Sequence, residues 1–405
     1  MFRITRFLEE INSPTVVGPR RNPPGPVVIW NLTWRCNLTC KHCYALAVDK
    51  AFPGELSTLE AYDVLDQLKA ARVPALILSG GEPLLRTDIH DIAARAKSMG
   101  FYTALSTNGT LIGEDDMQAI EDIGYDYIGI SIDGMRETHD KFRRLEGAFE
   151  ASMKAIKLCV ERDLKVGLRF TMTQDNAAEL DQVMDLLDQD NIERFYFSHL
   201  NYAGRGNHNR RDDAFFATTR EAMVKVFERC WGYLQSGEKK EFVTGNNDAD
   251  GVFMLKWVEQ NFPEHAQHIR AKLVQWGGNA SGVNVANIDN VGEVHPDTMW
   301  WHYGLGNVKE RPFGDIWSDT SDPLMAGLKA HPRKVGGRCA PCEHFDICGG
   351  NTRVRAQQVT GDAWAEDPGC YLNDSEIGLE EGAMERVEVT SYSKSRAVGQ
   401  GKGMA

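Results

Sequence analysis

Residues 27–43 read VVIWNLTWRCNLTCKHC, an apolar run that leads directly into three closely spaced cysteines. The apolar run predicts a short buried strand over residues 27–32. Cys36, Cys40 and Cys43 then follow in the spacing CxxxCxxC. Three thiolates on one loop can hold three corners of a [4Fe–4S] cubane and leave the fourth iron open to a small molecule. A structural zinc site is the alternative, but such a site normally takes four protein ligands.

Strand-like and helix-like segments alternate regularly after this loop. The alternation gives six β/α units, which imply parallel strands joined by right-handed crossovers. We therefore expect an α/β fold, a partial (β/α)6 TIM-like barrel with its active site at the carboxyl ends of the strands. The expected strands cover residues 27–32, 75–79, 102–106, 127–132, 165–171 and 195–200, and the expected helices cover 57–71, 88–99, 114–123, 149–162 and 177–188.

Motifs of polar residues and glycine end three of the expected strands. They read GGEP at 80–83, STNG at 106–109 and SIDG at 131–134, and an HDxxR stretch follows at 139–143. Paired glycines let a backbone approach a ligand closely, although a simple Gly-Pro turn also explains the first motif. With the CxxxCxxC loop, these motifs resemble the radical S-adenosylmethionine (radical SAM) superfamily. His42 stands where that family usually has an aromatic residue before the third cysteine.

The resemblance implies a cofactor and a set of residues that bind it. In the family, SAM binds the open iron, and one electron from the cluster cleaves it to methionine and a 5′-deoxyadenosyl radical. Cys36, Cys40 and Cys43 would then be the catalytic cluster ligands. The implied SAM contacts are Gly80, Gly81, Glu82, Ser106, Asn108, Ser131, Asp133 and Arg169. For Arg169, a surface salt bridge is the alternative to a contact with SAM.

A second cysteine group lies near the C-terminus, at Cys339, Cys342, Cys348 and Cys370. Four thiolates satisfy either a complete cluster or a zinc site. The upstream stretch NVGEVHP at 290–296 resembles the glycine hairpin of SPASM/Twitch extensions, which bind auxiliary [4Fe–4S] clusters. Those proteins have a cysteine just after the hairpin proline, and here the residue is Asp297. We therefore expect two [4Fe–4S] clusters in all, one that binds SAM and one auxiliary, with Asp297 as a minor candidate for an oxygen ligand.

The order of these features predicts a division of the chain into five parts. Residues 1–25 are expected to be an irregular lead-in and 26–235 the radical SAM barrel. Residues 236–290, with Asn- and Gly-rich stretches typical of ligand-binding loops or ordinary turns, are expected to bridge to the substrate. Residues 291–377 are the expected auxiliary-cluster domain, and 378–405 the expected flexible tail.

Composition restricts the partners and the compartment. The 405 residues carry a formal net charge of −13, which disfavours nucleic acid as a partner. The N-terminus has no signal-peptide pattern, and no apolar run is long enough to span a bilayer, so we expect a cytoplasmic protein without a membrane partner. Nine cysteines in that compartment are unlikely to form disulfides, and seven of them are grouped as for a metal.

Several longer stretches resemble the NirJ family of heme d1 biosynthesis, and the resemblance extends from Met1 to about Gly378. They include residues 195–206, 242–251, 276–287 and 365–370. The resemblance implies a tetrapyrrole substrate, 12,18-didecarboxysiroheme, from which two propionate side chains are removed, and a reductant such as flavodoxin or ferredoxin. The alternatives are a related heme-forming decarboxylase, a peptide-modifying SPASM enzyme and, more distantly, a non-catalytic iron–sulfur protein for electron transfer.

The loop after the sixth expected strand is the densest cationic segment beside a strand end. Because a tetrapyrrole with several carboxylates is anionic, we expect this loop to bind the substrate. Imidazoles at 199 and 208 are also candidate ligands of the substrate iron. A solvated basic loop beside a packed histidine is the alternative. The candidate substrate residues are His199, Arg205, His208, Arg210 and Arg211.

Overall fold

The computed structural model describes residues 1–18 and 24–392, and its centre is one ten-stranded sheet. The strand order is β10-β9-β8-β1-β2-β3-β4-β5-β6-β7. All pairs from β8 through β1 to β7 are parallel, and β9 and β10 add antiparallel pairs. The strands are β1 (Val27–Asn31), β2 (Ala75–Ser79), β3 (Tyr102–Thr107), β4 (Tyr127–Ser131), β5 (Val166–Met172), β6 (Arg194–His199), β7 (Glu241–Gly245), β8 (Val285–Ile288), β9 (Glu293–His295) and β10 (Gly306–Asn307).

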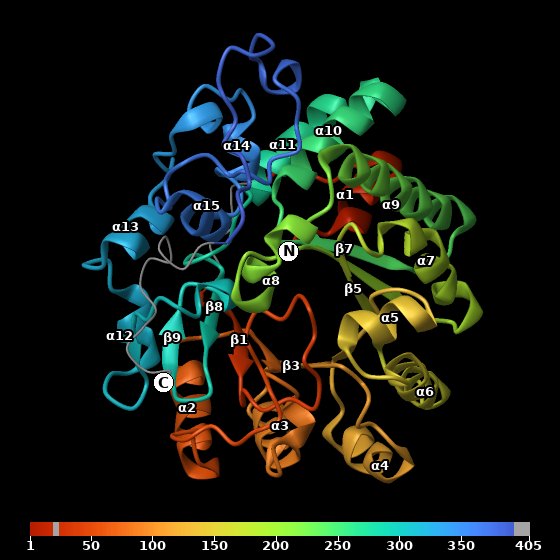
Figure 1. Cartoon of the computed structure of the whole chain (residues 1–405), viewed down its shortest axis with the longest axis vertical. Coiled ribbons are helices and arrows are strands. Elements are labelled where there is room, and N and C mark those ends of the chain that lie inside the picture. The colour runs from red at the N-terminus through yellow and green to blue at the C-terminus, as the bar shows by residue number, and fades with distance from the viewer. Residues whose placement is uncertain (19–23, 393–405) are drawn as a thin grey trace.

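Helices connect successive parallel strands and lie in an arc around the outside of the sheet (Figure 1). Because β7 and β10 end the strand order without pairing to each other, the sheet is an open, partial barrel as predicted. The α-helices are α1 (Ile4–Asn12), α2 (Thr58–Ala70), α3 (Ile89–Ser98), α4 (Glu114–Ile123), α5 (Arg136–Arg143), α6 (Ala148–Glu161), α7 (Leu180–Gln189), α8 (Gly204–His208), α9 (Phe216–Ser236), α10 (Ala249–Asn261), α11 (Ala266–Trp276), α12 (Phe313–Ser318), α13 (Pro323–Lys329), α14 (Phe345–Cys348) and α15 (Arg353–Thr360).

Apolar periodicity and capping explain why the predicted elements form where they do. Along β1, Val28 and Trp30 are fully buried, so alternate side chains enter the core. At the start of α2, the Ser57 hydroxyl accepts from the Glu60 amide while the Glu60 carboxylate accepts from the Ser57 amide. This capping box satisfies two backbone donors at the helix start. Together, the strands and helices place the loop of residues 32–57 at the carboxyl end of β1.

The predicted lead-in and the predicted bridging region both contain regular secondary structure. Residues 1–25 are not irregular throughout, because α1 buries Ile4, Leu8 and Ile11 as one apolar stripe. Phe2 also exchanges two backbone hydrogen bonds with Thr244 of β7. Residues 236–290 are mostly not loops, since they contain β7, α10, α11 and β8, and both strands belong to the barrel sheet.

The expected flexible tail is partly ordered. Val387 and Val389 pack against a small buried cluster formed by Leu200, Tyr202 and Val359. This packing fixes the part of the tail that continues to residue 392. Residues 393–405, to which the same expectation applied, lie outside the described residues.

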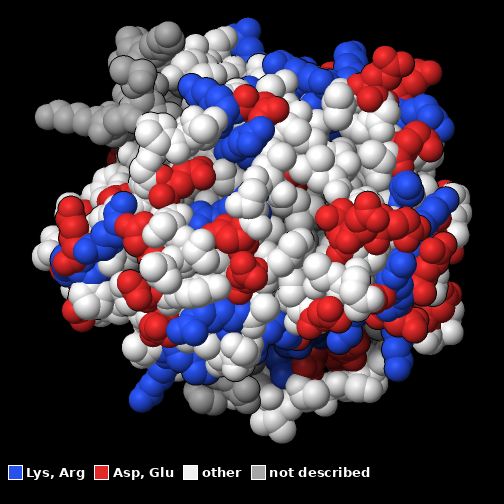
Figure 2. Space-filling model, turned by 90° about the horizontal axis from the view of Figure 1, so that it is seen from below, with Lys and Arg blue, Asp and Glu red and all other residues white. Residues whose placement is uncertain are grey.

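The surface mixes charges of both signs. On the face seen in Figure 2, Lys and Arg side chains alternate with Asp and Glu side chains. Within the described residues, no helix is long and apolar enough to cross a membrane.

Candidate functional site

The first cysteine group lies on the irregular loop after β1, at the carboxyl edge of the sheet. Cys36 and Cys40 are buried and Cys43 is half-buried. The loop is fixed through its backbone, because the Cys36 amide donates to Val48 O at 3.1 Å and the Arg205 amide donates to Cys43 O at 2.8 Å. In Figure 1 this loop and α8 lie side by side near the middle of the view. These backbone bonds therefore fix the loop that carries the three thiols.

The GGEP turn packs directly against the cysteine loop. The amides of Gly81 and Glu82 donate to Thr33 O and Arg35 O. A Cβ atom at Gly80 would lie 2.4 Å from Thr33 O, and Gly80 has a φ of +151°. A Cβ atom at Gly81 would lie 2.3 Å from Arg35 O. Glycine is thus required at 80 and 81 because the turn packs so closely against the cysteine loop. The sequence predicted that these glycines contact SAM and did not predict this packing.

The Glu82 side chain holds the GGEP turn in place through buried hydrogen bonds. Its fully buried carboxylate accepts from Thr107 Oγ1 and the Asn108 amide, both at 2.8 Å, and from the Leu84 amide at 3.2 Å. Burial raises the pKa of Glu82 to about 7, against the effect of these hydrogen bonds. The carboxylate therefore joins the ends of β2 and β3.

Three of the other expected SAM contacts line the same edge. The Arg169 guanidinium on β5 donates to Ser106 Oγ at 2.8 Å and lies over the Tyr196 ring at 4.9 Å. These are contacts inside the strand edge, unlike a surface salt bridge. Asn108 reaches the cysteine loop, where its side-chain Nδ2 donates to Asn37 Oδ1 at 3.0 Å.

The SIDG motif has a different role from the predicted direct contact with SAM. Ser131 is opposite Arg169 in the register of β4 and β5. The fully buried Asp133 accepts from the Thr171 amide at 2.8 Å and pairs with Arg143. Burial would raise the pKa of Asp133, but Arg143 and the nearby histidines hold it below its usual value. Both carboxylate oxygens are therefore engaged within the protein.

The second cysteine group assembles from three segments of the C-terminal part. Cys339 ends the 3-10 helix η6 (Gly337–Cys339), Cys348 ends α14, and Cys370 follows α15. Burial raises the pKa of the Cys348 thiol well above its usual value, and the neighbouring thiols of Cys339, Cys342 and Cys370 raise it further. The four cysteines thus belong to one region of the fold, and their role as ligands of one cluster stays a prediction.

The distinctive stretch at 276–287 supports this second group. A Cβ atom at Gly278, which has a φ of +72°, would lie 2.1 Å from Cys348 O. The next amide, that of Asn279, donates to the same carbonyl at 3.1 Å. Gly278 therefore allows this stretch to pack closely against the end of α14.

Asp297, at the position of the missing SPASM cysteine, is a helix cap. Its carboxylate accepts from the Met299 amide at 2.7 Å and from Ser281 Oγ. It begins the 3-10 helix η5 (Thr298–Trp300). Both carboxylate oxygens of Asp297 thus accept hydrogen bonds from neighbouring protein groups. This arrangement gives no support to the interpretation of Asp297 as a metal ligand.

The predicted substrate loop is instead a brace for the cysteine loop. Arg205 Nε donates to Cys40 O at 2.7 Å, and its Nη2 donates to Ala47 O at 2.9 Å. Arg210 is buried and donates to Thr390 O and Gln358 O at 2.6 and 2.8 Å. Backbone carbonyls thus occupy donors of both arginines, which favours a structural role for them over the predicted binding of substrate.

The remaining residues of the predicted substrate set are also accounted for. His199 is buried, and its Nε2 lies 3.0 Å from Asp250 Oδ1, which favours the alternative of a packed histidine. The exposed His208 has its ring 4.3 Å from the Tyr392 ring. Arg211 is exposed, and its carbonyl accepts from Gln174.

Sequence reasoning missed a buried network between the barrel and the second cysteine group. The Tyr371 hydroxyl donates to Asp250 Oδ1 at 2.7 Å, beside the contact of His199 with the same carboxylate. Tyr371 directly follows Cys370, so the network joins β6 and α10 to a cluster ligand. Asp250 lies in the distinctive stretch at 242–251, which was the only sequence signal for it.

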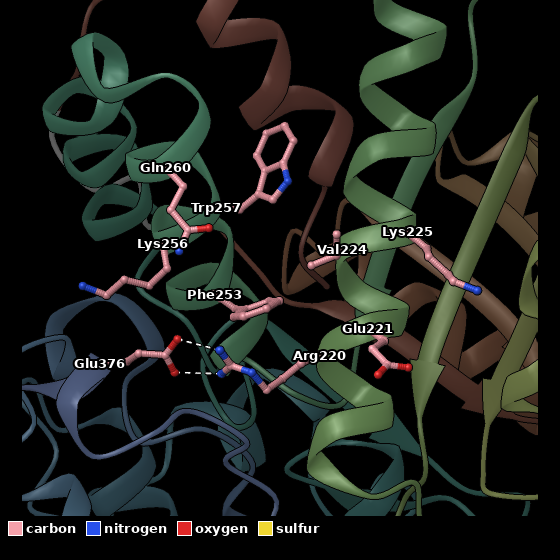
Figure 3. A pocket seen from close by; sticks show the side chains of 9 residues that line it. All are labelled: Arg220, Glu221, Val224, Lys225, Phe253, Lys256, Trp257, Gln260 and Glu376. Carbon is pink, nitrogen blue, oxygen red and sulfur yellow. Dashed lines mark hydrogen bonds and ion pairs between the residues drawn. The ribbon is translucent and has the colours of Figure 1, made fainter. Parts of the chain in front are cut away.

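A pocket of about 490 Å³ lies between α9, α10 and the 3-10 helix η7 (Ser375–Ile377), as Figure 3 shows. Arg220 crosses it to bond both oxygens of Glu376 at 2.7 Å and lies over the Phe253 ring. Its lining contains no cysteine and no predicted SAM contact. The pocket is therefore not the site defined by the cysteines.

The donor sets fit iron–sulfur clusters. The first group supplies three thiols and the second supplies four. Among the described residues, no group of three or more His, Cys, Asp or Glu side chains is arranged around a single metal ion, so the preference for clusters over zinc rests on donor type, number and spacing.

A parallel β/α sheet with three grouped cysteines after its first strand defines a radical SAM protein. Residues 30–187 match the Radical SAM superfamily, and the chain belongs to that superfamily. Pre-heme d1 synthase from Dinoroseobacter shibae is 50% identical to it over 93% of this chain and 94% of that protein. Fe-coproporphyrin III synthase from Methanosarcina barkeri is 43% identical over 88% of this chain and 90% of that protein.

A solved structure confirms the fold. Streptococcus suis SuiB bound to S-adenosylmethionine superposes with a TM-score of 0.66 over 86% of this chain and 78% of SuiB. The two sequences are 18% identical, so this likeness concerns the fold alone.

Proposed function

We propose that this chain is a pre-heme d1 synthase, which removes two propionate side chains from 12,18-didecarboxysiroheme by radical chemistry. The observation that supports this proposal most directly is 50% identity to the Dinoroseobacter enzyme over nearly the full length of both chains. The chain also has the two cysteine groups that the proposal assigns to clusters, and none of these cysteines is in a disulfide.

Each part of the site has a task in this proposal. Cys36, Cys40 and Cys43 would hold a [4Fe–4S] cluster with an open iron, and SAM bound there supplies the carbon radical needed to attack an unactivated C–H bond. Arg169 and Ser106 offer donors at the strand edge for an anionic group of SAM. Glu82 and the glycines keep the loop in place. A low-potential donor such as flavodoxin or ferredoxin would supply the electron.

The test is anaerobic turnover of the reconstituted protein with SAM, a reductant and 12,18-didecarboxysiroheme, followed by mass analysis of the tetrapyrrole and of 5′-deoxyadenosine. We expect 5′-deoxyadenosine and a tetrapyrrole that has lost two propionates. A modified tetrapyrrole with intact propionates would contradict the proposal. Absence of 5′-deoxyadenosine with both clusters loaded would favour an electron-transfer protein.

The second candidate function is that of a related heme-forming enzyme. It is favoured by the 43% identity to Fe-coproporphyrin III synthase. The same mass analysis separates the two, since a heme-forming enzyme would give a different pattern of side-chain loss on the macrocycle.

Metal content gives an independent check on the two donor sets. Three plus four cysteines predict two cubanes, so the reconstituted protein should hold about eight irons. Replacing Cys339 and Cys342 together with Ala should lower this to about four, because the second cubane loses half of its ligands. Iron and zinc are measured together by plasma mass spectrometry. Zinc in place of four irons, or about twelve irons, would contradict the assignment.

The brace formed by Arg205 makes a further prediction. Arg205→Ala removes two charge-assisted hydrogen bonds to the cysteine loop, each worth about 1.5–3 kcal/mol. We expect the variant to keep its auxiliary cluster but to lose iron from the first site, with a fall from about eight irons toward about four. Arg211→Ala, at an exposed neighbour, is the control and should keep about eight. Equal iron in the two variants would show that the brace is dispensable.

A further inference from the structure

Arg143, the last residue of α5, places a buried positive charge against one cluster ligand. Its Nη1 donates to Cys40 Sγ at 3.6 Å, and its Nη2 pairs with Asp133. The Arg143 side chain is 8% exposed and the Asp133 side chain is not exposed at all. This guanidinium is therefore neither a surface group nor a free substrate-binding group.

The surrounding contacts hold Arg143 in this position. The Lys41 amide donates to Phe142 O at 3.1 Å, and the His42 ring stacks on the Phe142 ring at 4.4 Å. Asp133, which pairs with Arg143, is itself fixed by the Thr171 amide. The end of α5 thus contacts the cysteine loop at Cys40 and at the two residues that follow it.

The three thiols of the loop have unequal electrostatic surroundings. Cys36 Sγ accepts a hydrogen bond from the neutral Leu38 amide at 3.4 Å. Cys40 Sγ accepts one from the Arg143 guanidinium at 3.6 Å, and Arg143 in turn pairs with Asp133. The donor that reaches the ligand sulfur is therefore charged at Cys40 and neutral at Cys36.

We propose that Arg143 raises the reduction potential of the cluster held by Cys36, Cys40 and Cys43. A cluster becomes more negative when it accepts an electron, so a fixed cation beside it stabilises the reduced form. Hydrogen bonds to the cluster sulfurs and the net charge nearby are among the factors that set such potentials. Donors that carry a formal charge are about twice as strong as neutral ones. The inference concerns the cluster alone and holds whichever tetrapyrrole, or other substrate, the enzyme accepts.

The test compares Arg143→Gln and Arg143→Lys with the unaltered protein. Midpoint potentials are measured by electron paramagnetic resonance during anaerobic titration with dithionite and mediators, without tetrapyrrole. The signal that changes when SAM is added identifies the N-terminal cluster. For Arg143→Gln we expect about a tenfold lower ratio of reduced to oxidised cluster at a fixed solution potential, which equals a fall of about 59 mV for one electron. Arg143→Lys keeps the charge but loses the fork geometry, so its shift should be smaller.

Lys141→Gln is the matched control, because it removes the same charge from an exposed position of the same helix. Its potential should not change. An unchanged potential in both Arg143 variants, or a shift equal to that of Lys141→Gln, would overturn the inference. Loss of the N-terminal cluster from both Arg143 variants would also overturn it, since Arg143 would then be a structural residue only.

Discussion

Cys40→Ala is expected to abolish the release of 5′-deoxyadenosine from SAM while the C-terminal cluster stays bound. The physical reason is that three thiolates are the minimum protein ligand set for a cubane with one open iron. Cys40 also accepts hydrogen bonds from two arginines, from Arg143 at its sulfur and from Arg205 at its carbonyl. Cys36→Ala and Cys43→Ala should have the same effect. The measurement is chromatography of 5′-deoxyadenosine after anaerobic incubation with SAM and dithionite.

The control for this experiment is Cys159→Ala, which removes a fully buried thiol from α6, away from both cysteine groups. It should keep SAM cleavage and about eight irons. Any of the three loop variants that still cleaves SAM at the unaltered rate would refute the assignment of that cysteine. Loss of activity in Cys159→Ala as well would indicate that the assay reports folding instead of cluster ligation.

The barrel was predictable because its signals are local. Each of the first six strands begins and ends within about one residue of its predicted range, since an apolar run and the polar residues after it are neighbours in sequence. The two cysteine groups were predictable for the same reason, as spacing alone shows that they can share a cluster. The helix α5 was missed because it is strongly polar and buries only His139, Phe142 and Arg143.

The roles of individual residues could not be predicted from the sequence where they depend on partners far away along the chain. Arg205 bonds Cys40 across 165 positions, and Arg210 bonds Thr390 across 180. A basic segment beside a strand end therefore looks the same in sequence whether its charges face a ligand or the chain itself. The helix α10 was missed for a related reason, because it is buried on nearly all sides and shows no amphipathic stripe.

Asp367 forms a buried, two-pronged ion pair in the predicted auxiliary-cluster region, and its loss should destabilise the protein. Arg355 Nε and Nη2 donate to the two Asp367 oxygens at 2.6 and 2.8 Å, and both side chains are buried. The same carboxylate accepts from the Gly369 amide at 2.9 Å, one residue before Cys370. It also accepts from the Thr352 amide at the start of α15. One carboxylate thus fixes α15 and the ligand that closes the second cysteine group.

Asp367→Ala leaves a buried guanidinium without its counter-charge, so it should destabilise the folded protein by about 3–5 kcal/mol. We also expect the auxiliary cluster to be lost, with iron falling to about four while SAM cleavage by the first cluster persists. The control is Asp66→Ala, which breaks the exposed pair with Arg95 and should cost no more than about 1 kcal/mol. Chemical denaturation and iron content are measured on both variants. The substitution removes the carboxylate and leaves the backbone of residue 367 in place. An Asp367→Ala protein that keeps about eight irons would therefore show that Cys370 is positioned without this carboxylate.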